Sequence, residues 1–297
     1  MKFAGLSAFP ITPADDDGVV DIRALRVLVQ RLAGAGVDSI GLLGSTGSAP
    51  YLSRAERRRA VEAAIDEAAG CVPVIVGIGA LRTSEAMALA RDAAGCGAAA
   101  VLLAPVSYTP LTDDEVFAHF QAVAGVAGVP VCIYNNPGTT HFTIGPALAA
   151  RLSRIAGVAA LKNPAPPPQA VAAELAALRA VLPAGFSIGA SVDMHATEAL
   201  LAGYQAWYSV LAGTLPQACV PIMRAAAAGE AATARALDAR LQPLWDLFAE
   251  YTSLRTVYAI VNLLGLCRAA PPRPLLTLDA AAHRRIAAAL EDLGLMA

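Results

Sequence analysis

Short, almost continuously apolar runs alternate along the chain with longer segments whose apolar residues recur every three or four positions. A run that is apolar on both faces is typical of a parallel strand buried in a sheet, whereas the three–four spacing is typical of an amphipathic helix. The pattern predicts eight strands, near residues 5–9, 39–43, 74–78, 99–103, 129–134, 158–162, 186–189 and 207–211. Helices are predicted between them, over 22–35, 55–69, 84–95, 114–125, 144–155, 169–182 and 194–202.

Eight strand–helix units in one chain of this size predict an α/β protein with a (β/α)8 TIM barrel. A doubly wound open sheet is the alternative. After Pro216 no strand is evident, and helices are predicted over 218–228, 231–251, 254–266 and 280–293. The chain is therefore expected to divide into a barrel core, 1–215, and a helical C-terminal extension, 216–297, that ends the last barrel unit and packs beside it.

The composition supports a large hydrophobic core and sets limits on partners. Of the 297 residues, 56% are hydrophobic and 15% are charged, and the formal net charge is −2. This composition argues against disorder, and the net charge does not favour nucleic-acid binding. No apolar run approaches the roughly 18 residues of a membrane span, so no membrane partner is expected. The run Arg57–Arg58–Arg59 is expected on the solvated face of a helix.

The cysteines and histidines suggest no cross-link and no metal site. Five cysteines stand far apart without a Cys-x-x-Cys pair, and the four histidines lack metal-ligand spacing. The start of the chain does not have the form of a secretory signal. We therefore expect buried, reduced cysteines, no metal and a cytoplasmic location.

In a (β/α)8 barrel, catalytic groups stand at the carboxyl ends of the strands. Lys162 ends one apolar run, in a chain whose 22 basic residues include only one other lysine, Lys2. Unlike arginine, a desolvated lysine can lose its proton and attack a carbonyl as an amine nucleophile. Tyr134 ends the preceding run, where its hydroxyl can transfer protons. The alternatives are a surface lysine and an ordinary core tyrosine.

Three further features follow predicted strands. The loop Gly44–Ser48 (Gly-Ser-Thr-Gly-Ser) offers backbone N–H groups and hydroxyls that suit a carboxylate or phosphate, although it lacks the Gly-Lys of a P-loop. Asp193 follows the seventh strand and can bind a substrate hydroxyl or simply begin a helix. Ser107 and Tyr108 follow the fourth strand, where either hydroxyl can face the site or play no role.

Taken together, these residues resemble the dihydrodipicolinate synthase / N-acetylneuraminate lyase family of Schiff-base-forming (β/α)8 enzymes. The resemblance runs essentially end to end. It rests on Gly44-Ser45-Thr46-Gly47, on Tyr134-Asn135-x-Pro137, and on Lys162, which stands 28 residues after the tyrosine. The joint occurrence of the three at this spacing is far more specific than any one of them.

The resemblance implies a role for each match. Lys162 would form an imine with the 2-oxo group of pyruvate or another 2-oxo acid, and Tyr134 would relay protons. Ser45 and Thr46, with Gly47 in the same loop, would bind the carboxylate, and Ser45 would also join the relay. The main chain near Tyr208 would line the pyruvate pocket. Covalent catalysis of this kind needs no metal or organic cofactor, and family members are commonly homotetramers, so a homotetramer or homodimer is expected.

Departures from the family pattern leave the second substrate, an aldehyde, unidentified. Thr139 stands where dihydrodipicolinate synthases place an arginine that holds a carboxylate. Ser107, with Tyr108 beside it, stands where they carry a tyrosine that reaches the neighbouring subunit's site. Asp193-Met194 stands where sialic-acid lyases favour Asp-Glu. The expected function is a pyruvate-dependent aldolase or lyase. The alternatives are a true 4-hydroxy-tetrahydrodipicolinate synthase, a sugar-acid dehydratase and, from another class, a non-catalytic 2-oxo-acid binding module.

Overall fold

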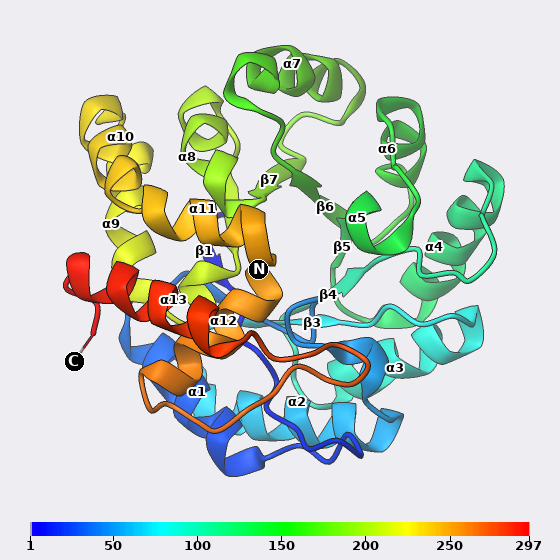
Figure 1. Ribbon diagram of the computed structural model, residues 1–297. Coiled ribbons are helices and arrows are strands. Elements are labelled where there is room, and N and C mark those ends of the chain that lie inside the picture. The colour runs from blue at the N-terminus through cyan, green and yellow to red at the C-terminus, as the bar shows by residue number, and fades with distance from the viewer. Residues whose placement is uncertain (1, 297) are drawn as a thin grey trace.

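The computed structural model describes residues 2–296, and its centre is a closed barrel of eight parallel strands (Figure 1). Each strand pairs with its neighbours in sequence, and β1 pairs with β8 to close the barrel. The (β/α)8 fold is therefore confirmed, and the open sheet is wrong. The strands are β1 (Gly5–Ala8), β2 (Ser39–Leu42), β3 (Val74–Gly77), β4 (Ala100–Leu103), β5 (Val131–Tyr134), β6 (Val158–Pro164), β7 (Ser187–Ser191) and β8 (Ala206–Ser209).

The barrel helices form the outer ring seen in Figure 1 and lie close to their predicted positions. They are α1 (Ile22–Gly34), α2 (Arg54–Ala68), α3 (Thr83–Gly95), α4 (Asp113–Ala127), α6 (Pro146–Leu152), α7 (Val171–Val181) and α8 (Asp193–Ala202). Short 3-10 turns lie at η1 (Ala49–Tyr51), η2 (Pro168–Ala170) and η3 (Leu211–Gly213). One helical turn, α5 (Pro137–Thr140), was not predicted.

Side-chain hydrogen bonds begin two of the barrel helices. The Thr112 side chain and Glu115 form a reciprocal capping box at the start of α4. The Ser53 side chain accepts from the Glu56 N–H at the start of α2, but the Glu56 carboxylate turns to the Val20 N–H instead of returning to Ser53. Glu56 therefore ties the loop before α1 to α2.

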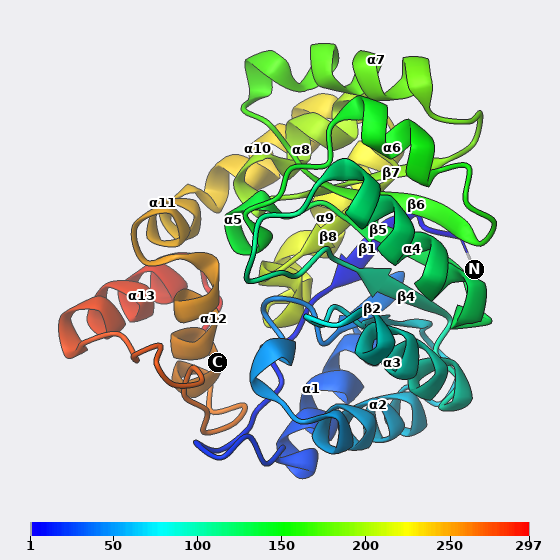
Figure 2. The same ribbon diagram turned by 90° about the vertical axis from the view of Figure 1, so that its right-hand side faces the viewer.

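Among the described residues after β8, every long element is helical: α9 (Pro216–Ala227), α10 (Ala231–Arg240), α11 (Gln242–Tyr251), α12 (Ser253–Leu263) and α13 (Ala280–Asp292), with a non-helical stretch over 264–279 before α13. The single helix predicted over 231–251 is wrong, since α10 ends at Arg240 and Pro243 cannot donate a helical hydrogen bond. Figures 1 and 2 together show α11, α12 and α13 in front of one end of the barrel. The helix α9 contacts α8 and β1, as the helix of the eighth barrel unit. The division of the chain into 1–215 and 216–297 stays a prediction.

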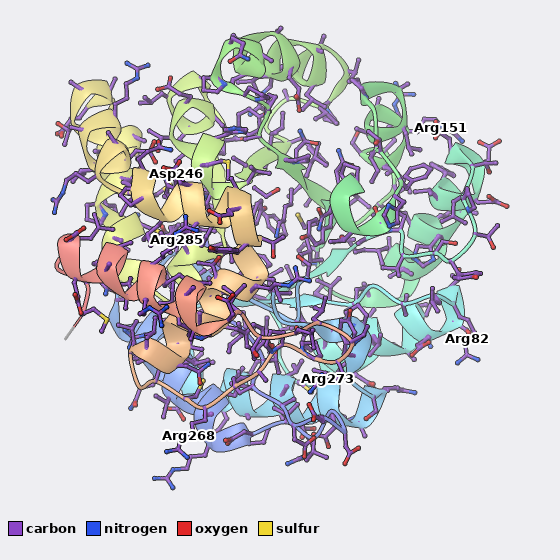
Figure 3. The ribbon with its side chains drawn as sticks, in the orientation of Figure 1. Arg82, Arg151, Asp246, Arg268, Arg273 and Arg285 are labelled. Atoms are coloured by element: carbon purple, nitrogen blue, oxygen red, sulfur yellow. The ribbon has the colours of Figure 1, made fainter. Side chains whose placement is uncertain are left out.

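The expectation that Arg57, Arg58 and Arg59 all face solvent is wrong for Arg57. Arg57 is buried, and its guanidinium donates to the carbonyl oxygens of Gly77 (3.0 Å) and Gly79 (3.2 Å). Burial lowers the pKa of Arg57 to about 10. Arg82, just before α3, and Arg151 of α6 project outward, as Figure 3 shows. Arg57 instead joins α2 to the end of β3.

The five cysteines are all free, but only Cys132 and Cys219 are buried. The expectation of uniformly buried cysteines is therefore wrong for Cys71, which is exposed, and for Cys96 and Cys267, which are partly exposed. Within residues 2–296, no cluster of three His, Cys, Asp or Glu side chains could hold a metal ion. No helix in the same range is long and apolar enough to cross a membrane.

Candidate active site

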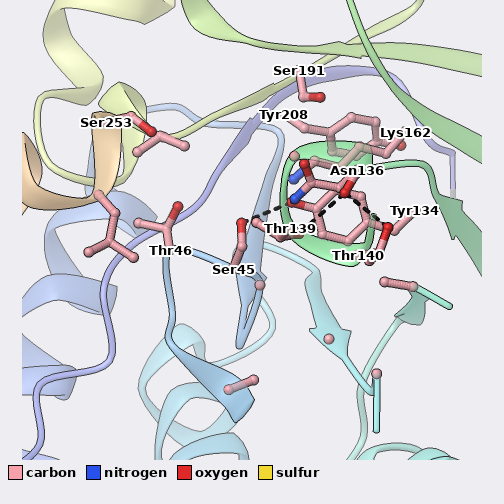
Figure 4. A pocket seen from close by; sticks show the side chains of 18 of the residues that line it. Ser45, Thr46, Tyr134, Asn136, Thr139, Thr140, Lys162, Ser191, Tyr208 and Ser253 are labelled. Carbon is pink, nitrogen blue, oxygen red and sulfur yellow. Dashed lines mark hydrogen bonds between the residues drawn. The ribbon is translucent and has the colours of Figure 1, made fainter. Parts of the chain in front are cut away.

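A cavity of about 760 Å³ opens at the carboxyl ends of the barrel strands. Its walls come from the loops after β2, β3, β4, β5, β7 and β8, and from α11 and α12 of the C-terminal part. Figure 4 shows part of this lining, with Lys162 on one side and Ser253 on the other. The cavity therefore lies where barrel enzymes place their catalytic groups.

Lys162 lies on β6 with only 3% of its surface exposed. Its Nζ atom is 3.7 Å from the centroid of the Phe9 ring, 4.2 Å from that of Tyr134 and 5.6 Å from that of Tyr208. No ion pair holds this amine among the residues that the structure describes. A carbonyl compound that enters the cavity would therefore reach an amine that is not held in an ion pair.

The Phe9 ring beneath Lys162 depends on a glycine of the neighbouring strand. A Cβ atom at Gly41 would lie 2.2 Å from the Phe9 ring, so any larger residue would displace it. The Phe9 ring also packs edge-on against Tyr208 at a centroid distance of 6.0 Å. Gly41 and Phe9 thus support the amine from below, and neither was predicted as part of the site.

A hydrogen-bonded trio lies beside the amine. The Tyr134 hydroxyl is 2.9 Å from Ser45 Oγ and accepts a hydrogen bond from Asn136 Nδ2 at 2.8 Å. The register of the barrel places Tyr134 directly opposite Lys162 on the adjacent strand. With Asn136 donating, the tyrosine proton is free to point to Ser45, so the two hydroxyls form a continuous path for a proton. Sequence reasoning missed Asn136, which occupies the variable position of the Tyr-Asn-x-Pro motif.

The loop that carries Ser45 and Thr46 turns sharply after β2. Leu43 adopts a left-handed conformation (φ 57°) although it is not glycine. At Gly47 a Cβ atom would lie 2.9 Å from the Leu43 backbone. Ser45 and Thr46 line the cavity, whereas Gly47 does not. Gly47 therefore allows the loop to fold, and its predicted contact with the substrate stays a prediction.

Backbone strain is concentrated around the cavity. Within residues 2–296, six non-glycine residues have positive φ, and four of them line the cavity: Leu43, His141, Val192 and Thr252. Such conformations each cost on the order of 1–3 kcal/mol and tend to occur at functional sites. The distribution supports this cavity as the place where the chain does its chemistry.

Asp193 lines the cavity, but its carboxylate is used by the protein itself. Oδ1 accepts from Trp207 Nε1 at 2.8 Å, and Oδ2 accepts from the N–H groups of Val210 (3.0 Å) and Leu211 (2.9 Å). Burial raises the pKa of this carboxyl group, although the N–H donors act in the opposite direction. These bonds tie α8 to the end of β8, which favours a positioning role over the predicted contact with a substrate hydroxyl.

Tyr208 is buried and lines the cavity. Its ring faces Lys162, and its hydroxyl contacts Cys132 Sγ at 3.6 Å. Burial raises the pKa of Tyr208 well above its ordinary value, which keeps the hydroxyl protonated. Its hydroxyl is not part of the Ser45–Tyr134 pair, and the predicted contact of the Tyr208 main chain with pyruvate stays a prediction.

The remaining predicted residues lie farther from the amine. Thr139 lines the cavity, with its hydroxyl bonded at 3.3 Å to the Asn136 carbonyl oxygen. Ser107 and Tyr108 do not line the cavity, and Tyr108 is 97% exposed. The structure therefore brings neither of them to Lys162 within one chain.

A polar network behind the site fixes the ends of β5 and β6. Asn135 Nδ2 donates to Asn163 Oδ1 at 2.7 Å, and Asn163 Nδ2 donates to Glu174. Asn135 also bonds the backbone of Ile144 through both its oxygen and its nitrogen. Burial raises the pKa of Glu174. Because Asn135 and Asn163 directly follow Tyr134 and Lys162, the network sets the spacing of the two catalytic candidates.

Comparison with known proteins gives one consistent relationship. The model of the dihydrodipicolinate synthetase family matches residues 2–293. A 4-hydroxy-tetrahydrodipicolinate synthase from Methylococcus capsulatus is 33% identical over 286 residues, covering 96% of this chain and 97% of the relative.

Solved structures show the same relationship. A dihydrodipicolinate synthase from Agrobacterium tumefaciens is 54% identical, with a TM-score of 0.96 and 98% of each chain covered. A putative dihydrodipicolinate synthetase from Pseudomonas aeruginosa is 33% identical with a TM-score of 0.90, covering 98% of this chain and 99% of that one. The fold, the Lys162–Tyr134–Ser45 arrangement and the family match agree, and the chain belongs to the dihydrodipicolinate synthetase family.

Proposed function

We propose that the chain is a lyase, a class I aldolase that binds pyruvate as an imine on Lys162 and makes or breaks a carbon–carbon bond to an aldehyde. The observation that carries this proposal is the buried Lys162 amine beside the hydrogen-bonded pair Tyr134 and Ser45. A nucleophile next to a proton-transfer group is the combination that covalent catalysis requires.

The first half of the reaction uses these three residues. The Lys162 amine attacks C2 of pyruvate, and the carbonyl oxygen takes up a proton through the Tyr134–Ser45 pair. The carbinolamine then loses water and becomes a protonated imine. Ser45 and Thr46 line the cavity where they can receive the pyruvate carboxylate.

The second half forms the new bond. The protonated imine withdraws electrons, so C3 gives up a proton and the imine becomes an enamine. The enamine carbon attacks the carbonyl carbon of the aldehyde, whose oxygen accepts a proton. Water then hydrolyses the imine, which releases the product and regenerates the Lys162 amine.

Exchange of the pyruvate methyl protons with D₂O, followed by proton NMR, tests this function without knowledge of the aldehyde. Wild type is expected to exchange them, because the imine and the enamine interconvert. Lys162→Met is expected to abolish exchange while keeping a side chain of similar size against the aromatic rings. Exchange in Lys162→Met at the wild-type rate would contradict the proposal. Pyruvate binding without exchange in wild type would favour the non-catalytic binding module.

The relatives that share this chain's length are named 4-hydroxy-tetrahydrodipicolinate synthase, which supports that activity as the second candidate. Thr139 weighs against it, because its side chain carries no charge to hold a carboxylate. We also propose a homotetramer or homodimer, to be tested by light scattering. The cytoplasmic location stays a prediction.

A further inference from the structure

The cavity extends well beyond the room that pyruvate needs beside Lys162. It reaches the C-terminal helices, where Phe248 of α11 and Thr252–Arg255 at the start of α12 line it. Figure 4 shows Ser253 across the cavity from Lys162. A second substrate that reacts at the imine would therefore extend toward α12.

Arg255 stands at this far wall, in the first turn of α12. Its guanidinium makes one hydrogen bond, from Nη1 to Thr252 Oγ1 at 3.3 Å, and no carboxylate is paired with it in residues 2–296. By contrast, the guanidinium of Arg235 contacts both carboxylate oxygens of Glu198. Arg255 thus keeps most of its donors available on a cavity wall, in the planar arrangement that fits a carboxylate.

The charged residues that line the cavity favour a substrate with a negative charge over one with a positive charge. The basic groups among the described lining residues are Lys162, His141 and Arg255, and the one acid is Asp193. Both Asp193 oxygens already accept N–H groups of the protein. A carboxylate on the substrate can therefore be paired within this part of the chain, whereas an ammonium group finds no free carboxylate there.

We propose that Arg255 binds the carboxylate of the aldehyde substrate, and that this aldehyde carries a carboxylate but no ammonium group. This inference rests on the function proposed above. It assigns to the C-terminal helix α12 the contact that the uncharged Thr139 cannot make. The Thr139 hydroxyl already bonds the Asn136 carbonyl oxygen, so Thr139 offers no substitute.

Three four-carbon aldehydes test the proposal as a matched set. Butanal has no charge, 4-oxobutanoate adds the carboxylate, and 2-amino-4-oxobutanoate adds the ammonium group as well. Each is assayed by its kcat/KM for pyruvate consumption with wild type, Arg255→Gln, Arg255→Lys and Arg284→Gln. Arg284 is the control, because it is an exposed arginine of α13 that does not line the cavity.

With wild type, 4-oxobutanoate is expected to exceed both other aldehydes in kcat/KM. Arg255→Gln is expected to lose about 10- to 100-fold with 4-oxobutanoate, the range for a hydrogen-bonded charge, and to change little with butanal. Arg255→Lys is expected to recover part of the loss, because it keeps the charge without the planar fork. Arg284→Gln is expected to behave as wild type.

Methyl-proton exchange of pyruvate separates the possible failures. Exchange is expected to stay at the wild-type rate in Arg255→Gln, which also shows that this variant is folded. A wild type that exchanges these protons but does not prefer 4-oxobutanoate, or an Arg255→Gln that keeps the preference, would overturn this inference alone. A wild type without exchange would overturn the proposed function and this inference with it.

Discussion

Removing the Asp193 carboxylate separates a positioning role from a role in substrate binding. Asp193→Ala leaves three N–H groups without their acceptor: the buried groups of Trp207 (Nε1) and Leu211 (backbone) and the part-buried backbone group of Val210. Asp193→Asn keeps one acceptor oxygen but turns an NH₂ group toward either Trp207 or the backbone pair. Both variants should therefore loosen the join between α8 and β8.

The expected magnitude follows from these contacts. A buried donor left unsatisfied costs about 1–3 kcal/mol, so three give an upper range of roughly 3–9 kcal/mol. Part of this is offset, because the burial that raises the pKa of Asp193 shows that the carboxylate is itself costly to desolvate. The cavity beside Asp193 can also admit water to the freed groups. We expect about 3 kcal/mol for Asp193→Ala and less for Asp193→Asn.

Thermal unfolding followed by circular dichroism measures this loss. For a chain of this size, about 3 kcal/mol corresponds to a fall in Tm of roughly 6–12 °C. Pyruvate methyl exchange on the same samples, well below Tm, reports whether the amine still works. An Asp193→Ala protein with the Tm of wild type but a large loss of kcat/KM toward the aldehyde would refute the positioning role and restore the predicted substrate contact.

Other predictions address the proton path and the effect of pH. Asn136→Leu removes the 2.8 Å donor to Tyr134 and should slow pyruvate methyl exchange by about 10-fold, with imine trapping intact; unchanged exchange would show that Asn136 is not needed. The pKa of His119 is lowered from 6.5 because burial disfavours its charged form. The unfolded chain therefore binds a proton near pH 6.5 that the folded chain binds only at lower pH, so stability should fall as the pH drops through this window. Urea midpoints at pH 7.5 and 5.5 should differ less in His119→Gln than in wild type, and an equal difference would contradict this assignment.

The barrel could be predicted from the sequence because its signals are local. Strands buried on both faces are continuous apolar runs, and the covering helices show the three–four spacing, so all eight strands were found within a few residues. Breaks that depend on a single residue were less visible. The separation of α10 from α11 beside Pro243 and the helical turn Pro137–Thr140 were both missed.

The site was only partly predictable, because side-chain partners depend on tertiary packing. Lys162 stood out as a rare residue type at a strand end, and Tyr134 followed from the same pattern. The sequence could not show that Arg57 turns inward to two carbonyl groups or that Asp193 serves the backbone after β8. Arg255 lies 93 residues after Lys162 in the sequence, and only the fold brings its helix to the cavity.

The account depends above all on the Lys162 imine. Incubation with pyruvate and borohydride, followed by peptide mass spectrometry, tests it most directly, because borohydride reduces the imine to a stable amine. We predict a single adduct on Lys162, with the mass of one pyruvate less water plus two hydrogens, and none in Lys162→Met. A folded wild-type protein that gives no adduct, or an adduct on Lys2 alone, would contradict the account.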